Sequence, residues 1–145
     1  MLRLTKSTER WWQKPLAEVS GRPIPAELAV LYAELQPGER GAWLNSRGTT
    51  SGATDLVRQA SGRLKTKRQR LPIFVSQVLK SLYETTGLVK GAPDLVIWNE
   101  DGTTVRFVEV KCPHWDQPSA EQIKFMQAAE ARGFPASIAE WEFAE

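Results

Sequence analysis

Apolar residues recur at helical spacing in two parts of the chain, and a third part carries signals for the start and end of a helix. In residues 25–37 and 72–87 they lie three and four positions apart, and each run begins with a proline, which suits a first helical turn. Residues 119–133 begin with a serine that can cap a helix and end at a glycine. The pattern therefore predicts helices over these three ranges.

Between the second and third helices the pattern changes to that of strands. Residues 94–99 and 104–111 are rich in β-branched and aromatic side chains, as strands are. Asp101-Gly102 between them is a strong signal for a hairpin. Residues 135–143 predict a final strand, with alternate apolar side chains on one face.

Two stretches carry weaker patterns. Residues 1–24 have few periodic apolar positions, which predicts an extended or irregular N-terminal arm. Residues 38–70 are rich in Gly, Ser, Thr and Arg, and short helical turns are expected there, around residues 54–59. The order of the clear elements is typical of an α/β or α+β domain, with a small mixed sheet and a β-hairpin flanked by helices.

The length of 145 residues suits one domain with a hydrophobic core. We expect residues 1–145 to form a single domain with three parts. The arm of residues 1–24 precedes a helical and basic region, residues 25–86, and the C-terminal core of residues 87–145 carries the motifs.

Composition excludes several kinds of protein. Hydrophobic residues make up 41% and charged residues 25%, as in soluble globular proteins, and no apolar run is long enough for a membrane span. The basic N-terminal stretch has no apolar core, so no secretory signal is expected. A single cysteine and a single histidine exclude a cysteine-based zinc cage and a multi-histidine site. We expect a cytoplasmic protein.

The net charge of +2 hides an uneven distribution. Residues 58–70 contain six Lys and Arg and no acid, whereas residues 112–145 contain six acids and two bases. A local basic segment can bind phosphate groups. The alternative interpretation is a solvated surface loop.

The predicted hairpin brings charged side chains together. If Asp101-Gly102 is a two-residue loop, the numbers of opposed residues sum to 203, so Asp94 faces Glu109. Lys111 lies two residues beyond Glu109, on the same face. Opposed β carbons lie about 4.5–5.5 Å apart, and two carboxylates at that distance repel unless a proton, a cationic side chain or a divalent metal intervenes. The alternative is that these charges simply extend into solvent.

A divalent cation suits this face of the hairpin. Mg²⁺ is typically held by one or two carboxylates and waters, here Asp94 and Glu109, and the backbone carbonyl of Val110 could be a further ligand. Such an ion polarises a phosphoryl oxygen and lowers the pKa of bound water. Lys111 could orient that water or stabilise charge that develops on the phosphate.

These residues resemble a known motif. Gly91-Ala92-Pro93-Asp94 followed by Glu109-Val110-Lys111 is similar to the PD-(D/E)xK nuclease motif. The wider run GAPDLVIWN…FVEVKCPHWDQPSAEQ resembles the VRR-NUC family, which includes the nuclease module of Fanconi-associated repair nucleases and small stand-alone bacterial and phage proteins. The resemblance covers residues 87–143.

The resemblance implies a single nuclease domain with a restriction-endonuclease-like core. It implies a Mg²⁺- or Mn²⁺-dependent endonuclease that acts as a homodimer on branched DNA such as Holliday junctions or flaps, in DNA repair or recombination. Asp94 and Glu109 would hold the metal and Lys111 would be the catalytic lysine. A cytoplasmic protein encoded by a bacterium or a phage is expected.

Further site residues follow from the resemblance. The family carries another acid on an early helix, for which Glu27, Glu34 and Glu84 are candidates. Gln122 would lie near the active site. Ser119-Ala120-Glu121-Gln122 also fits a capping box, and the two roles are compatible.

A nuclease would give the basic and aromatic residues a role. We expect phosphate contacts, without base-reading motifs, from Arg63, Lys65, Lys67, Arg68 and Arg70. Trp11 and Trp12 could stack on unpaired bases or be buried in the fold or in a dimer interface. The alternative function is a non-catalytic DNA-junction-binding module that retains the nuclease fold.

Overall fold

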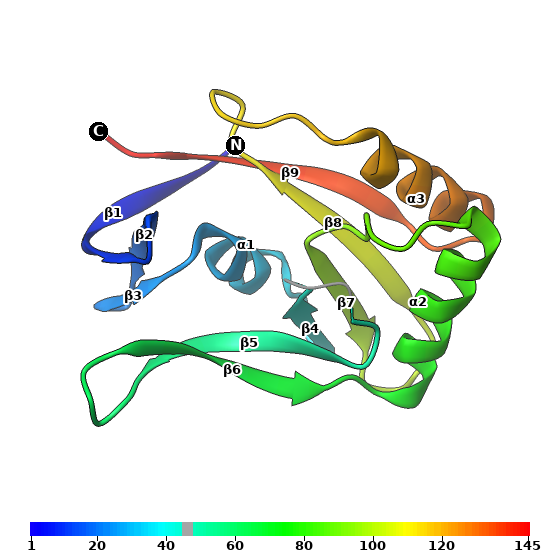
Figure 1. Ribbon diagram of the computed structural model, residues 1–145, viewed down its shortest axis with the longest axis horizontal. Coiled ribbons are helices and arrows are strands. Elements are labelled where there is room, and N and C mark those ends of the chain that lie inside the picture. The colour runs from blue at the N-terminus through cyan, green and yellow to red at the C-terminus, as the bar shows by residue number, and fades with distance from the viewer. Residues whose placement is uncertain (45–47) are drawn as a thin grey trace.

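The structure is a computed structural model that describes residues 1–44 and 48–145. Its described residues form one curled mixed sheet of nine strands and three helices (Figure 1). In chain order the elements are β1 (Leu2–Trp11), β2 (Lys14–Val19), β3 (Arg22–Ile24), α1 (Ala26–Glu34), β4 (Glu39–Trp43), β5 (Ser51–Arg58), β6 (Leu64–Arg70), α2 (Ile73–Thr86), β7 (Leu95–Asn99), β8 (Val105–Lys111), α3 (Ala120–Ala131) and β9 (Ala136–Phe143).

The order of strands across the sheet is β3-β2-β1-β9-β8-β7-β4-β5-β6. β9 pairs in parallel with both β1 and β8, and the other neighbours are antiparallel. The α+β class with a mixed sheet is therefore confirmed. The expectation of a small sheet is wrong, because the weakly patterned stretches also supply strands.

Residues 1–24 are extended, and they pair into β1, β2 and β3 rather than forming an irregular arm. The helical turns expected around residues 54–59 are wrong, because β5 occupies that range. Its small residues allow close packing: a Cβ at Gly52 would lie 2.6 Å from the Cβ of Ala42 on β4. The stretch from 38 to 70 also contains residues 45–47, which lie outside the described residues.

The three helices lie where the spacing predicts them, and Gly87 ends α2 with a φ of +71°. The hairpin register is also confirmed, since Trp98 pairs with Val105 and Val96 with Phe107. The turn is wider than two residues, because β7 ends at Asn99 and the Gly102 amide donates to the Asn99 carbonyl at 3.0 Å. The turn extends equally on both sides of Asp101-Gly102, so the pairing register of β7 and β8 is unchanged.

The two faces of β7 and β8 pack against different helices. Leu95, Ile97 and Val108 join the core around α1, inside the curl of the sheet. Val96 and Phe107 join a second core, which α2 and α3 cover on the outer face (Figure 1). Among the described residues, no helix has the length and apolar character needed to cross a membrane.

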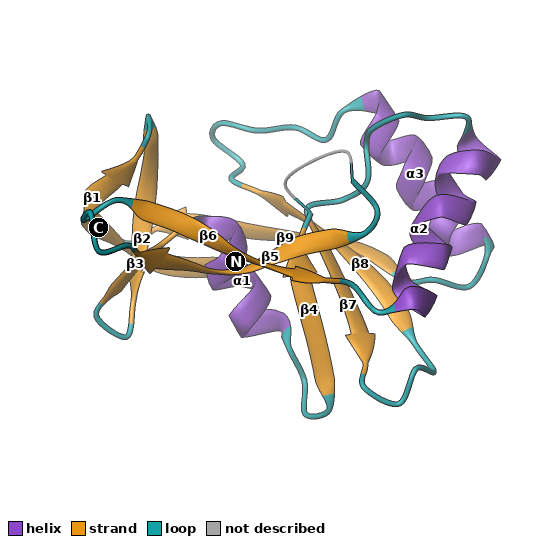
Figure 2. Cartoon of the chain, turned by 60° about the horizontal axis from the view of Figure 1, so that its bottom comes forward, coloured by secondary structure: helices purple, strands orange, loops and turns teal. Residues whose placement is uncertain are grey.

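The curl brings opposite ends of the sheet into contact. Arg22 on β3 forms an ion pair with Asp55 on β5 and donates to the Leu56 carbonyl at 3.1 Å. The Trp11 indole donates to the Leu64 carbonyl on β6 at 3.2 Å. Figure 2 shows β1 to β3 beside the far end of β5 and β6. Among the described residues, side chains rather than a backbone ladder join these ends.

Candidate active site

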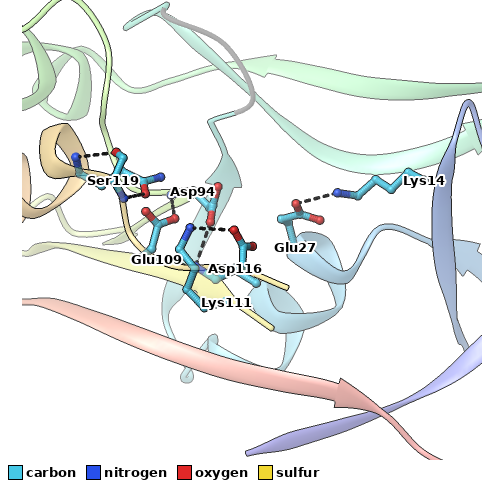
Figure 3. Close-up of polar contacts among 9 residues, drawn as sticks. Lys14, Glu27, Asp94, Glu109, Lys111, Asp116 and Ser119 are labelled. Carbon is cyan, nitrogen blue, oxygen red and sulfur yellow. Dashed lines mark hydrogen bonds and ion pairs between the residues drawn. The ribbon is translucent and has the colours of Figure 1, made fainter. Parts of the chain in front are cut away.

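Asp94 and Glu109 face one another where β7 begins (Figure 3). The backbone amide of Asp94 donates to Glu109 Oε1 at 3.3 Å, and the amide of Val110 donates to Asp94 Oδ2 at 2.9 Å. Each carboxylate is thus held by the backbone of the other's strand. The juxtaposition expected from the hairpin register is present in the structure.

Glu109 is buried in spite of its charge. Its residue is 0% exposed, and its Oε2 atom is buried without a hydrogen-bond partner among the described residues. Burial, together with the facing Asp94 carboxyl, raises the pKa of Glu109 to about 9, and Lys111 opposes this shift. Without a bound metal ion, the Asp94–Glu109 pair therefore retains a proton at neutral pH.

Lys111 ends β8 on the same face and is 8% exposed. Its Nζ lies 3.5 Å from Oδ1 of Asp116, in the loop that leads to α3. Figure 3 shows Asp94, Glu109, Lys111 and Asp116 gathered in one place. Sequence reasoning missed Asp116, for which the signal was an acid five residues after the lysine in a short polar connection.

The donor set fits a hard divalent cation. Two facing carboxylates, one with an orphaned buried oxygen, provide the negative oxygen ligands that Mg²⁺ or Mn²⁺ prefers. No three His, Cys, Asp or Glu side chains converge on a metal position within residues 1–44 and 48–145. Asp94 and Glu109 would therefore be completed by a backbone carbonyl, such as that of Val110, and by waters.

Of the three candidates for a further acid, Glu27 has the most suitable surroundings. Its Oε2 accepts from Lys14 at 2.9 Å, while its Oε1 is buried without a partner among the described residues. Figure 3 shows this pair beyond Asp94, on α1 and β2. Glu34 lies 3.7 Å from Arg106, and Glu84 is exposed on α2.

The capping box at the start of α3 is confirmed. The backbone amide of Gln122 donates to Ser119 Oγ at 3.1 Å, and the backbone amide of Ser119 donates to Gln122 Oε1 at 2.9 Å. Ser119 lies beside Glu109 in Figure 3, so this helix begins near the two carboxylates. The cap occupies Oε1 of Gln122, which leaves its side-chain NH₂ group as the donor available near the site.

Gly91 of the motif allows the start of α3 to pack closely against the loop before β7. Its φ is +114°, and a Cβ at this position would lie 2.7 Å from the Cβ of Glu121. Any larger residue would push the start of α3 away from the loop before β7. The glycine of GAPD therefore serves the packing of α3 against the site.

The basic residues predicted to bind DNA lie elsewhere. Arg63 lies in the turn before β6, and β6 itself, at the edge of the sheet, carries Lys65, Lys67, Arg68 and Arg70. All five are exposed, and Arg68 donates to the Ser51 carbonyl at 3.2 Å. β4 and β5 separate them from β7, so the structure does not bring them beside Asp94. Lysines on an edge strand also hinder strand pairing between molecules.

Among solved structures, the chain is similar to two crystal structures of paFAN1 bound to gapped DNA with a 5′ flap. With a flap of two nucleotides the identity is 24%, the TM-score 0.40, and the match covers 48% of this chain and 14% of that chain. With a flap of one nucleotide the identity is 25% and the TM-score 0.40, and the match covers 52% of this chain and 14% of that chain. The match thus spans a small part of those longer chains. A search among curated proteins finds no match.

The match to a domain family extends much further. The family model of the VRR-NUC domain matches residues 28–141, from α1 to β9. It includes the hairpin with Asp94 and Glu109, the loop with Asp116, and α3. This is wider than the range over which the motifs resemble the family. Because the match covers most of the chain, the protein belongs to the VRR-NUC family of nuclease domains.

Proposed function

We propose that this chain is a divalent-metal-dependent DNA endonuclease with a PD-(D/E)xK active site. The observation that carries the proposal is the buried Glu109 carboxylate, which faces Asp94 and leaves one oxygen without a partner among the described residues. Membership of the VRR-NUC family supports it, since nucleases of that family generally depend on a divalent metal.

Each site residue has a role in phosphodiester hydrolysis. Asp94 and Glu109, with the Val110 carbonyl, would hold Mg²⁺ or Mn²⁺, and Glu27 is the best candidate for an additional acid. The bound cation supplies Lewis acidity to the phosphoryl oxygen and lowers the pKa of water.

Lys111 brings a positive charge to the same face. Its ammonium group, held near Asp116, can orient the attacking water or stabilise charge that develops on the phosphate. The start of α3, with the Gln122 side-chain amide, offers further donors to a phosphate nearby.

The proposed substrate is branched DNA, such as a Holliday junction or a flap. Exposed Lys and Arg on β6 suit contacts to phosphates, which report the shape of DNA but not its base sequence. A homodimer, also proposed, would present two such sites to two strands of one junction.

The test is cleavage of labelled linear duplex, 5′-flap and four-way junction DNA, with EDTA, Mg²⁺ or Mn²⁺. We expect cutting that needs the metal, that is lost in Asp94→Asn, and that is kept in Glu84→Gln, which changes an exposed carboxylate on α2. Absence of metal-dependent cutting on every substrate would contradict the proposal, as would full activity of Asp94→Asn.

One observation favours the alternative of a non-catalytic junction-binding module. Among the described residues, no three acidic side chains are placed to hold one metal ion, and Asp116 contacts Lys111. Such a module would bind branched DNA in a salt-dependent way and cut none of the three substrates under any metal. The cleavage assay, paired with a binding assay in EDTA, separates the two functions.

A further inference from the structure

A pocket lies far along the sheet from Asp94, where the β1–β2 turn meets the β5–β6 turn. It has a volume of about 350 Å³, and two tryptophans and three arginines line it together with Glu9. Figure 2 shows the ends of β1 and β6 side by side at this place. The residues proposed for catalysis do not contribute to it.

The two tryptophans of the pocket differ in how they are held. Trp11 is fixed, because its indole donates to the Leu64 carbonyl and its ring meets that of Trp43 edge to face at 6.4 Å. Trp12 is 86% exposed and forms part of the pocket wall. The large apolar surface of Trp12 is therefore presented to solvent beside a rigid neighbour.

The backbone of Trp12 is unusual as well. Trp11 pairs with Lys14, so Trp12 and Gln13 form a two-residue turn, in which Trp12 has a φ of +56°. Glycine or asparagine normally occupies such a position, and a bulky residue there is strained. Neither the turn nor the core explains this tryptophan, and strained exposed residues of this kind are concentrated at binding sites.

The arginines give the pocket a positive charge. Arg58 is neutralised by Glu9, whose Oε1 lies 2.6 Å from the guanidinium. Arg10 donates to the neutral Gln13 carbonyl at 3.0 Å and has no acidic partner in residues 1–44 and 48–145. The exposed Arg63 side chain has no hydrogen bond or ion pair within those same ranges. Two positive charges therefore remain available beside Trp12.

We infer that this pocket binds an unpaired nucleotide of single-stranded DNA, with the base on the Trp12 indole and its phosphate between Arg10 and Arg63. Aromatic side chains beside arginines are the usual platform for unpaired bases, because every base can stack. The pocket volume lies within the range of small-ligand sites. The inference rests on the proposed function, in that a flap or a frayed junction arm supplies the unpaired strand.

The test measures binding in EDTA, where metal-dependent cleavage is stopped. Fluorescence anisotropy of labelled oligothymidylate and of blunt duplex DNA is compared for wild type, Trp12→Gly, Trp12→Phe, Arg63→Ala and Arg132→Ala. The last variant removes an exposed arginine at the end of α3, away from the pocket. Thermal melting of each variant is measured in parallel.

We expect Trp12→Gly to weaken oligothymidylate binding roughly 5- to 150-fold, the range for loss of one stacked base. Blunt duplex binding should change little, and Trp12→Phe should keep most of the affinity. Glycine accepts the left-handed backbone, so the melting temperature of Trp12→Gly should be unchanged or higher. Arg63→Ala should also weaken oligothymidylate binding, and Arg132→Ala should not.

Wild-type affinity of Trp12→Gly for oligothymidylate would overturn the inference, as would an equal loss for blunt duplex. The outcomes remain separable from those of the nuclease proposal. If the protein cuts DNA and Trp12→Gly binds normally, only the pocket inference fails. If it cuts nothing but binds oligothymidylate through Trp12, only the nuclease proposal fails.

Discussion

Glu109 is a carboxylate that the fold keeps away from water. Its strand lies between β7 and β9, and its Cα pairs with that of Ile138. A buried carboxylate destabilises a fold unless it is protonated or faces a cation. In the absence of metal, protonation removes the buried negative charge of Glu109. When metal is present, a divalent ion shared with Asp94 would neutralise that charge.

Metal should therefore stabilise the protein through this residue. We expect Mg²⁺ or Mn²⁺ at one hundred times Kd to raise the unfolding free energy of wild type by about 2.7 kcal/mol, and so to raise its melting temperature. Glu109→Gln should lose this shift while melting in EDTA at an equal or higher temperature. Thermal scans against metal concentration measure it, with Glu84→Gln as control. The same shift in Glu109→Gln would exclude metal binding at this carboxylate.

Lys111 should matter for chemistry more than for binding. Methionine fills a similar volume without the charge, so Lys111→Met should fold normally. We expect the cleavage rate to fall about 10²- to 10³-fold, as for loss of one group that stabilises transition-state charge, while affinity for DNA in EDTA stays close to wild type. Single-turnover cleavage and anisotropy measure the two. Equal losses of both would assign Lys111 to substrate binding.

At the scale of elements, one arginine connects three parts of the fold. Arg106 on β8 donates to both carboxylate oxygens of Glu39 on β4, at 2.9 and 3.0 Å, and to the Glu34 carbonyl at the end of α1 at 2.8 Å. The hydrogen bond from Arg106 lowers the pKa of Glu39. This contact holds α1 and β4 in place against the hairpin that carries Asp94.

The Glu39–Arg106 contact should make stability depend on pH. Because the folded pKa of Glu39 is depressed, its contribution is complete above the unfolded value, about 4.3, and is lost as pH falls through the folded value. Glu39→Gln should cost about 1.5–3 kcal/mol at neutral pH and less in acid. Urea unfolding at both pH values measures this. Glu100→Gln, in an exposed pair with Arg40, should cost under about 1 kcal/mol.

The sequence predicted those elements whose side chains repeat with one period. The hairpin register placed Asp94 against Glu109 because the predicted turn was centred on Asp101-Gly102, and the wider turn of the structure has the same centre. β6 was not predicted, because its seven residues include no buried side chain and their composition is that of a charged surface loop. The proximity of Glu27 and Lys14 could not be predicted either, because it depends on how α1 packs against β2, which no periodicity in the sequence shows.

At the scale of the whole molecule, the basic residues of β6 and the candidate active site on β7 and β8 lie on different strands. DNA that reaches Asp94 while contacting β6 must extend across β4 and β5. Contacts to β6 would therefore add affinity without touching the scissile phosphate, and they would respond strongly to salt.

Removing two of these charges should weaken binding without changing chemistry. We expect Lys65→Gln with Lys67→Gln to lower the affinity for every DNA substrate and to reduce the slope of log affinity against log salt by about 0.9 for each phosphate that the protein no longer neutralises. The cleavage rate at saturating enzyme should not change. Anisotropy over a salt series measures the slope, with Lys80→Gln and Lys124→Gln on α2 and α3 as the matched pair. An unchanged slope would leave β6 a protected sheet edge only.

β9 also determines when the sheet can be completed. It lies between β1 and β8, and Leu2 at the start of the chain pairs with Trp141 near its other end. As the ribosome synthesises the chain, β1 to β3 emerge before β9, and β1 can gain its second neighbour only when β9 follows. During that time the growing polypeptide exposes an open strand edge, the state in which nascent proteins aggregate or recruit chaperones.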